Sequence, residues 1–166
     1  MEVERCPGCG VEFPPFAGPV HRYMESSPSC WAAYGEVLAR EHNDPAFMAA
    51  HRLTVDAYAV QHPGRPSPQS IQSVAVHLIS LYVVLEEQLS HRAATRLMQR
   101  SADRMHFVWL EPPLDRGARN VTTIVAVRSP DDHVCAVQSW AKSLWQAWSQ
   151  HHSQVRAWAA EVQATP

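Results

Sequence analysis

Residues 129–163 read SPDDHVCAVQSWAKSLWQAWSQHHSQVRAWAAEVQ, and one set of side chains in this stretch recurs at alternating steps of three and four. The set consists of Val134, Val137, Ala141, Leu144, Trp148, His151, Val155, Trp158 and Val162. Such spacing keeps one face of an α-helix apolar and predicts a helix that packs in a bundle. His151 interrupts the apolar face, so we expect a hydrogen bond or a metal ion to satisfy its imidazole.

Four pairs of a capping residue and a proline mark where helices begin, because proline suits the first helical position. The pairs are Ser27-Pro28, Asp44-Pro45, Ser67-Pro68 and Ser129-Pro130. They predict helices over residues 28–42, 45–61, 68–100 and 130–163, and residues 122–127 favour one further short helix. Residues 68–100 are apolar on several sides, so this helix is expected at the centre. The predicted fold class is mainly α, a four- to five-helix bundle with an N-terminal zinc knuckle.

Length and charge limit the classes of protein to consider. A chain of 166 residues with 46% hydrophobic residues can bury one core, so we expect a single domain with residues 1–30 as a zinc-knuckle appendix and 31–166 as the bundle. The 14 Lys and Arg residues balance 16 Asp and Glu residues without a basic run, which disfavours nucleic acid as a partner.

The start of the chain, MEVER, contains neither an apolar core nor a cleavage-like site. No stretch reads as apolar over the roughly 18 residues that a membrane span needs. These features favour a cytoplasmic protein that does not bind a membrane. In a reducing compartment, the four cysteines are expected to be thiols or metal ligands rather than disulfides.

A knuckle with the sequence Cys6-Pro7-Gly8-Cys9-Gly10 places two thiolates on a tight turn, as a tetrahedral zinc site requires. Cys30 is the expected third ligand, because with Ser27 as the cap it falls in the first turn of a helix, where the helix dipole favours a thiolate. His21 is the nearest candidate for the fourth ligand, and His42 and Cys135 are reserves. A complete Cys₃His shell would bind a structural Zn²⁺ without an open coordination position.

Two other interpretations of the cysteines stay open. Cys6 and Cys9 could be small turn residues and Cys30 a core thiol. A redox Cys-x-x-Cys pair is the other interpretation, but such a pair normally opens a helix after a strand, whereas Phe13-Pro14-Pro15 follows here.

Histidines in the helical body suggest a second site. His51, Tyr58 and His62 fall on one face of the predicted second helix, but His51 and His62 are about 16 Å apart along it and cannot share an ion. The short connector after His62 predicts an antiparallel neighbour, which would pair Asp56 with His77. The candidate catalytic residues are therefore His51, Asp56, Tyr58, His62, His77 and His151.

The chain resembles an uncharacterised bacterial family known only as a domain of unknown function, which opens with Cys-Pro-Gly-Cys-Gly. The resemblance covers nearly the whole chain and rests on Cys6-Pro7-Gly8-Cys9-Gly10, His21-Arg22-Tyr23-Met24, Ser27-Pro28-Ser29-Cys30-Trp31, residues 51–64, Ser73-Val74-Ala75-Val76-His77-Leu78, Trp109-Leu110-Glu111-Pro112-Pro113 and residues 140–152. This family implies no activity. A helical bundle with inward histidines also resembles the DinB-like metalloenzymes in architecture. The chain departs from them, because its last helix lacks a His-x-x-x-His pair.

Three functional hypotheses follow from these features. The first is a metal-dependent hydrolase or transferase with a structural zinc and a separate histidine-lined pocket, which implies a second metal and a small-molecule substrate. The second is a non-catalytic binding or adaptor module in which zinc staples the N-terminus, with a protein partner or a second copy of the chain on its surface. The third is a metal or redox sensor that uses Cys6, Cys9 and Cys30.

Overall fold

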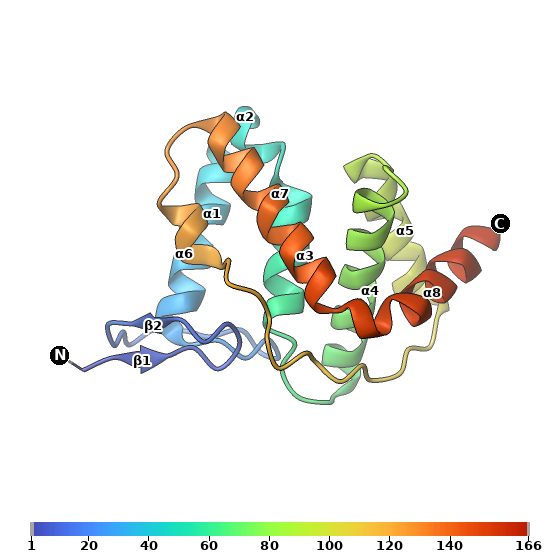
Figure 1. The fold of residues 1–166 in the computed structure, drawn as a ribbon, viewed down its shortest axis with the longest axis horizontal. Helices are drawn as coiled ribbons and strands as arrows, with labels where there is room; N and C mark the ends of the chain where they lie inside the picture. Colours follow the sequence, from blue (N-terminus) through green and yellow to red (C-terminus); the bar gives the residue numbers. More distant parts are fainter. Residues whose placement is uncertain (1, 166) are drawn as a thin grey trace.

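The computed structural model describes residues 2–165, and within them the regular secondary structure is helical apart from one short two-stranded hairpin (Figure 1). This confirms the predicted fold class. The elements are β1 (Glu4–Arg5), β2 (Glu12–Phe13), α1 (Pro28–Asn43), α2 (Pro45–Met48), α3 (His51–Gln61), α4 (Pro68–Leu85), α5 (His91–Arg104), α6 (Val121–Val125), α7 (Pro130–Ala147), the 3₁₀ turn η1 (Ser149–His151) and α8 (His152–Ala164).

The helices form a bundle with the N-terminal hairpin at one end (Figure 1). α3 contacts α4 and α7, α4 also contacts α5 and α8, and α1 contacts α2 and α6. α4 is the central helix that the sequence predicts, because most of its residues are buried.

The hairpin pairs Glu4 with Phe13 and Arg5 with Glu12 in antiparallel register, and it lies beside the start of α1. Cys6 and Cys30 belong to the same core as the helices, and the expected boundary at residue 30 would cut α1.

All four predicted capping residues cap helices. The side chains of Ser27, Ser67 and Ser129 each accept a hydrogen bond from an amide three residues later, and Asp44 accepts one from Ala46. Each satisfies an amide that would otherwise lack a partner at a helix start. The short helix expected within residues 122–127 is also present, as α6, and Asn120 caps it.

Three predicted helices are broken in the structure. The segment 45–61 divides at residues 49–50 into α2 and α3. The segment 68–100 divides after α4, where Gln88 takes a positive φ of 57° and Ser90 caps α5. The segment 130–163 divides at η1, and His151 lies at this break with its Nε2 donating to the Glu111 carbonyl at 2.8 Å. His151 is therefore not a core residue on a continuous helix. The helix is interrupted at the position where the predicted apolar face would have buried this side chain.

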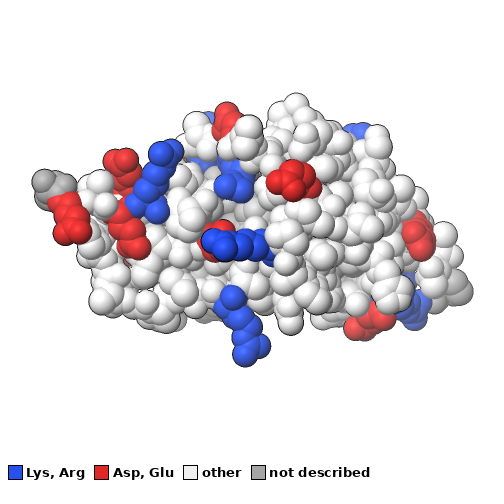
Figure 2. All heavy atoms as spheres, turned by 90° about the horizontal axis from the view of Figure 1, so that it is seen from below, with Lys and Arg blue, Asp and Glu red and all other residues white. Residues whose placement is uncertain are grey.

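Neither the surface charge nor the apolar helix α4 points to a particular class of partner. Seen from below, the protein carries both charge signs interspersed, in keeping with its net charge of −2 (Figure 2). By length and composition, α4 is apolar enough to cross a membrane, contrary to the expectation that no segment would be. However, 56% of that segment is buried inside the protein, as in the core helix of a soluble bundle.

A buried carboxylate joins three helices. Glu41 on α1 is fully buried, and its Oε1 accepts hydrogen bonds from His133 Nε2 on α7 at 2.9 Å and from the Thr54 hydroxyl on α3. Its Oε2 accepts from His51 Nδ1 on α3 at 2.8 Å. Since every donor here is directed at one carboxylate, removal of that carboxylate would leave buried polar groups without partners.

We expect Glu41→Ala to lower the free energy of unfolding by about 2–4 kcal/mol, because it leaves the fully buried Nε2 donor of His133 unpaired and removes the shared acceptor of His51 and Thr54. Urea unfolding of the protein at neutral pH measures this change. Glu36→Ala is the matched control, because Glu36 is exposed on the same helix, and it should change stability by no more than about 0.5 kcal/mol. Equal losses in the two variants would contradict the assigned role of Glu41.

Candidate metal centre

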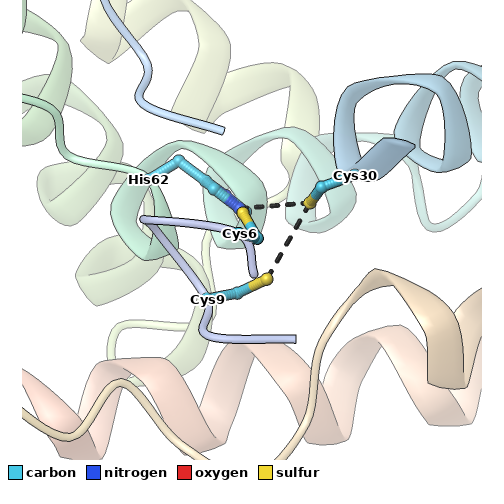
Figure 3. A group of neighbouring side chains, drawn as sticks. All are labelled: Cys6, Cys9, Cys30 and His62. Carbon is cyan, nitrogen blue, oxygen red and sulfur yellow. Dashed lines mark hydrogen bonds between the residues drawn. The ribbon is translucent and has the colours of Figure 1, made fainter. Parts of the chain in front are cut away.

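Three cysteines and one histidine meet where the N-terminal knuckle touches the bundle. Cys6 and Cys9 come from the turn between β1 and β2, Cys30 from the first turn of α1, and His62 from the residue that ends α3 (Figure 3). One ligand atom from each of these four residues lies within 4.8 Å of all the others. Within residues 2–165, this is the one group of three or more Cys, His, Asp and Glu side chains with that property.

The knuckle is shaped by its own backbone. Cys6 accepts a hydrogen bond from the Gly10 amide at 2.9 Å and donates its own amide to the Val11 carbonyl at 2.8 Å. Gly10 has a φ of +74°, a conformation that glycine adopts without the strain a side chain would bring. This turn directs both thiols of the Cys-x-x-Cys sequence toward α1 and α3.

His62 is held with one particular nitrogen facing the sulfurs. Its Nδ1 lies 2.8 Å from the Tyr58 carbonyl, and because a carbonyl can only accept, Nδ1 carries the proton. Nε2 is then the nitrogen with a free lone pair, and it lies 3.4 Å from Cys30 Sγ. A backbone partner for the remote nitrogen is the usual way in which proteins orient a histidine that ligates a metal.

Tyr58 supports both Cys30 and His62. Its ring stacks on the His62 ring with centroids 3.9 Å apart, and its hydroxyl lies 3.5 Å from Cys30 Sγ. Burial raises the pKa of Tyr58, so the phenol keeps its proton and can donate it toward the Cys30 sulfur. Tyr58 is thus fully buried beside the ligands rather than exposed to a substrate.

The electrostatics of the cluster favour a bound cation. Contacts from the Cys30 and Cys9 thiols lower the pKa of Cys6 far below its usual range, whereas the contacts of Cys30 with Cys6 and Cys9 raise the pKa of Cys30. The Cys30 hydrogen bond lowers the pKa of Cys9, but the Cys6 contact and burial outweigh it and raise this pKa to about 11. Only one of the three sulfurs can therefore ionise readily by itself, and three thiolates need a positive ion among them.

The structure places His62, and not His21, beside the three cysteines, which corrects the expected fourth position. His21 Nδ1 instead accepts hydrogen bonds from the Tyr23 amide at 3.3 Å and the Met24 amide at 3.2 Å. Burial lowers the pKa of His21, in keeping with a neutral ring that accepts hydrogen bonds. The two reserve residues lie elsewhere, since His42 packs against His51 and Cys135 is exposed on α7.

The other candidate catalytic residues do not meet at one place. Asp56 and His77 form the predicted pair, with His77 Nδ1 2.8 Å from Asp56 Oδ1. Arg52 and the Ser80 hydroxyl donate to the same carboxylate, so its acceptor positions are filled. Ser80 donates to Asp56 and not to His77, so the three residues lack the order of a catalytic triad.

His51 and His151 occupy two further environments, and His62 belongs to the cysteine cluster. His51 binds Glu41, and His151 binds the backbone of Glu111. Sequence reasoning missed Glu41 and His133, although both fall on helical stripes of buried residues. The stripe of α1 is Cys30, Tyr34, Val37 and Glu41, and that of α7 includes His133, Val137, Trp140 and Leu144.

The chain belongs to a family described as "Family of unknown function (DUF5946)", whose model matches residues 4–149. The match includes the knuckle, Cys30 and His62. No curated protein and no solved structure matches the chain. The architectural likeness to DinB-like metalloproteins stays an expectation, and the function has to be argued from the site itself.

We expect Gly8→Ala to weaken metal binding at this cluster by roughly tenfold or more, the usual effect of disturbing a group that orients a metal ligand. A Cβ atom at Gly8 would lie 2.2 Å from Cδ2 of the His62 ring and 2.6 Å from the Glu25 carbonyl, so the ring would have to move away from the sulfurs. Competition with a chromophoric chelator measures this affinity.

Gly35→Ala is the control for this substitution. A Cβ at this exposed position in α1 meets nothing within 4 Å, so the affinity of the cluster for a metal ion should stay unchanged and the free energy of unfolding should rise by about 0.5–1 kcal/mol. Unchanged metal affinity in both variants would refute the close approach of Gly8 to His62 as a condition for binding.

Proposed function

We propose that Cys6, Cys9, Cys30 and His62 bind one Zn²⁺ ion, and that this ion staples the N-terminal segment to a non-catalytic binding module. One observation supports this proposal most directly: the three cysteine sulfurs lie close to the His62 Nε2 atom, and the lone pair of this nitrogen faces them. Thiolate and imidazole ligands in a four-donor set favour zinc over the hard cations, which prefer oxygen.

The site has the character of a structural zinc centre. Four protein donors complete a tetrahedral shell and leave no position for a reacting water. Cys6 and His62 are 1% exposed and Cys30 is 0% exposed, so protein covers most of the shell. A catalytic zinc would instead keep an open position toward a substrate pocket.

The proposed ion would connect parts of the chain that have few other means of staying together. β1 and β2 contain two residues each, which is too short for an independently stable hairpin. Phe16 and Val20 in the segment after the hairpin are about half exposed, so hydrophobic burial contributes little there. Zinc binding energy would supply the folding energy that this segment lacks.

The arrangement of the other histidines supports a binding module over a hydrolase or transferase. Each of His51, His77 and His151 has its own separate partner, and Asp56 has its acceptor positions filled. A partner protein, a small molecule or a second copy of the chain would bind a surface of the module. Cytoplasmic placement belongs to the same proposal, because the cysteines must stay reduced to bind zinc.

Metal analysis of protein purified without a histidine tag tests this proposal. We expect about one zinc per chain, and its removal should lower the melting temperature, because ion binding stabilises only the folded state. His62→Ala should lose the zinc, whereas the matched variant His21→Ala should keep it.

Two outcomes would contradict the proposal. A parent protein that neither contains nor rebinds zinc would exclude the metal centre. A second metal equivalent that survives in the Cys6→Ser/Cys9→Ser variant would favour the metal-dependent enzyme instead.

A further inference from the structure

Two cysteines of the proposed zinc centre, Cys6 and Cys9, line a cavity. The cavity has a volume of about 510 Å³ and lies between the knuckle and the loop that contains Arg116. Residues 5–10 and 114–117 line it, so the sulfur-bearing turn forms one wall and the loop forms the other. Cys9 is partly exposed, whereas Cys6, Cys30 and His62 are buried. Cys9 is therefore the ligand that a small molecule in the cavity can reach.

Two arginines stand at the same cavity. Arg5 donates its Nε to the Gly10 carbonyl at 3.2 Å, and Arg116 lies within 3.5 Å of the Pro7 carbonyl. These guanidinium groups offer hydrogen-bond donors to an oxygen atom that develops negative charge near Cys9.

The loop that carries Arg116 is fixed to the metal centre through the residue next to His62. Gln61 is fully buried, and its side-chain amide donates to the carbonyls of Arg116 at 3.0 Å and Arg119 at 2.8 Å. The Trp140 indole in turn donates to the Gln61 carbonyl oxygen at 3.2 Å. The backbone of the Arg116 loop is thus fixed beside the knuckle by the buried Gln61 side chain.

A second sulfur lies within reach of Cys9. The Sγ atoms of Cys9 and Cys30 are 3.8 Å apart, and Figure 3 shows them facing one another. An oxidised Cys9 therefore has a neighbouring sulfur, Cys30, that can resolve it and that is a thiolate while it is a zinc ligand, which is the arrangement of a redox-sensitive cysteine pair.

We propose that Cys9 is an oxidation site for small hydroperoxides that enter this cavity, and that its oxidation joins it to Cys30 and releases the zinc. This inference rests on the proposed zinc centre. It adds to that centre a modification site, a co-substrate class and a consequence, namely the loss of the staple.

The chemistry balances with a hydroperoxide as the oxidant. The Cys9 thiolate attacks one peroxide oxygen, an S–O bond forms, the O–O bond breaks, and the departing oxygen takes a proton from solvent. Cys30 then attacks the Cys9 sulfur of this sulfenic acid, an S–S bond forms, and hydroxide leaves and is protonated to water. With hydrogen peroxide, two thiolates and two protons yield one disulfide and two waters, and Zn²⁺ loses two of its four ligands.

Treatment of the full, zinc-loaded protein with hydrogen peroxide tests the proposal, with released zinc followed by a chromophoric chelator and the thiols mapped by mass spectrometry. Cys135 is an internal reference, because it is an exposed thiol outside the metal centre. We expect zinc release to coincide with a Cys9–Cys30 disulfide and to precede oxidation of Cys135. Trypsin would cut after Arg5 and Arg22, so this disulfide would link two peptides, whereas a Cys6–Cys9 disulfide would stay within one.

Substitution of Arg116 tests the cavity. Arg116→Gln should slow zinc release by about tenfold, because a charge-assisted hydrogen bond to the departing oxygen strengthens in the transition state. Arg92→Gln is the matched control, because it removes an equal charge from an exposed position on α5 and should leave the rate unchanged.

The outcomes separate this inference from the zinc centre itself. Protein that binds one zinc and keeps it while Cys135 is oxidised would overturn the inference and leave the zinc centre standing. A disulfide between Cys6 and Cys9, or equal rates for Arg116→Gln and the parent, would also overturn it. Protein that binds no zinc would overturn both proposals.

Discussion

The hydrogen bond from His62 Nδ1 to the Tyr58 carbonyl is the constraint on which the N-terminal part of this protein depends. It fixes the proton on one nitrogen and turns the other toward the sulfurs, at the point where α3 ends. The stacked Tyr58 ring holds the imidazole plane, and the missing side chain at Gly8 lets the knuckle approach that ring. The three cysteines can form a four-ligand metal site only because α3 ends at His62, which places a fourth donor beside them in the core.

α3 has the same connecting role along its whole length. Thr54 binds Glu41 of α1, Asp56 binds His77 and Ser80 of α4, and Gln61 binds the loop before α6. These polar residues are fully buried, and each one directs its hydrogen bonds to a different neighbour. Because an unpaired polar group in the core costs free energy, such contacts penalise alternative packings of the helices. Thr54, Asp56 and Gln61 thus contribute to specifying the arrangement of the bundle, and Asp56 does so as one of the residues that the sequence suggests as catalytic.

Local signals in the sequence predict much of this structure, and non-local contacts account for what they miss. The capping residue at each Ser-Pro or Asp-Pro pair acts within a few residues, and the short connector after His62 brings Asp56 to His77. No glycine or proline marks the helix break at Gln88 in the sequence. The helix break near His151 follows from contacts with Glu111, which lies 40 residues away. His62 was missed as the fourth donor because it lies far along the chain from the knuckle, whereas His21 was nearer in sequence but has its Nδ1 occupied by backbone amides.

The same separation in sequence explains why an ion suits this position better than more apolar contacts would. The segment before α1 contributes one short hairpin and several prolines, so it has little apolar surface to bury and few backbone hydrogen bonds of its own. A tetrahedral ion at the proposed site would concentrate the joining energy at one point, because its ligands would come from the knuckle, α1 and α3 together. The joint would then depend on each ligand, and under our proposal the most accessible ligand, Cys9, would determine how readily the N-terminal segment is released from the bundle.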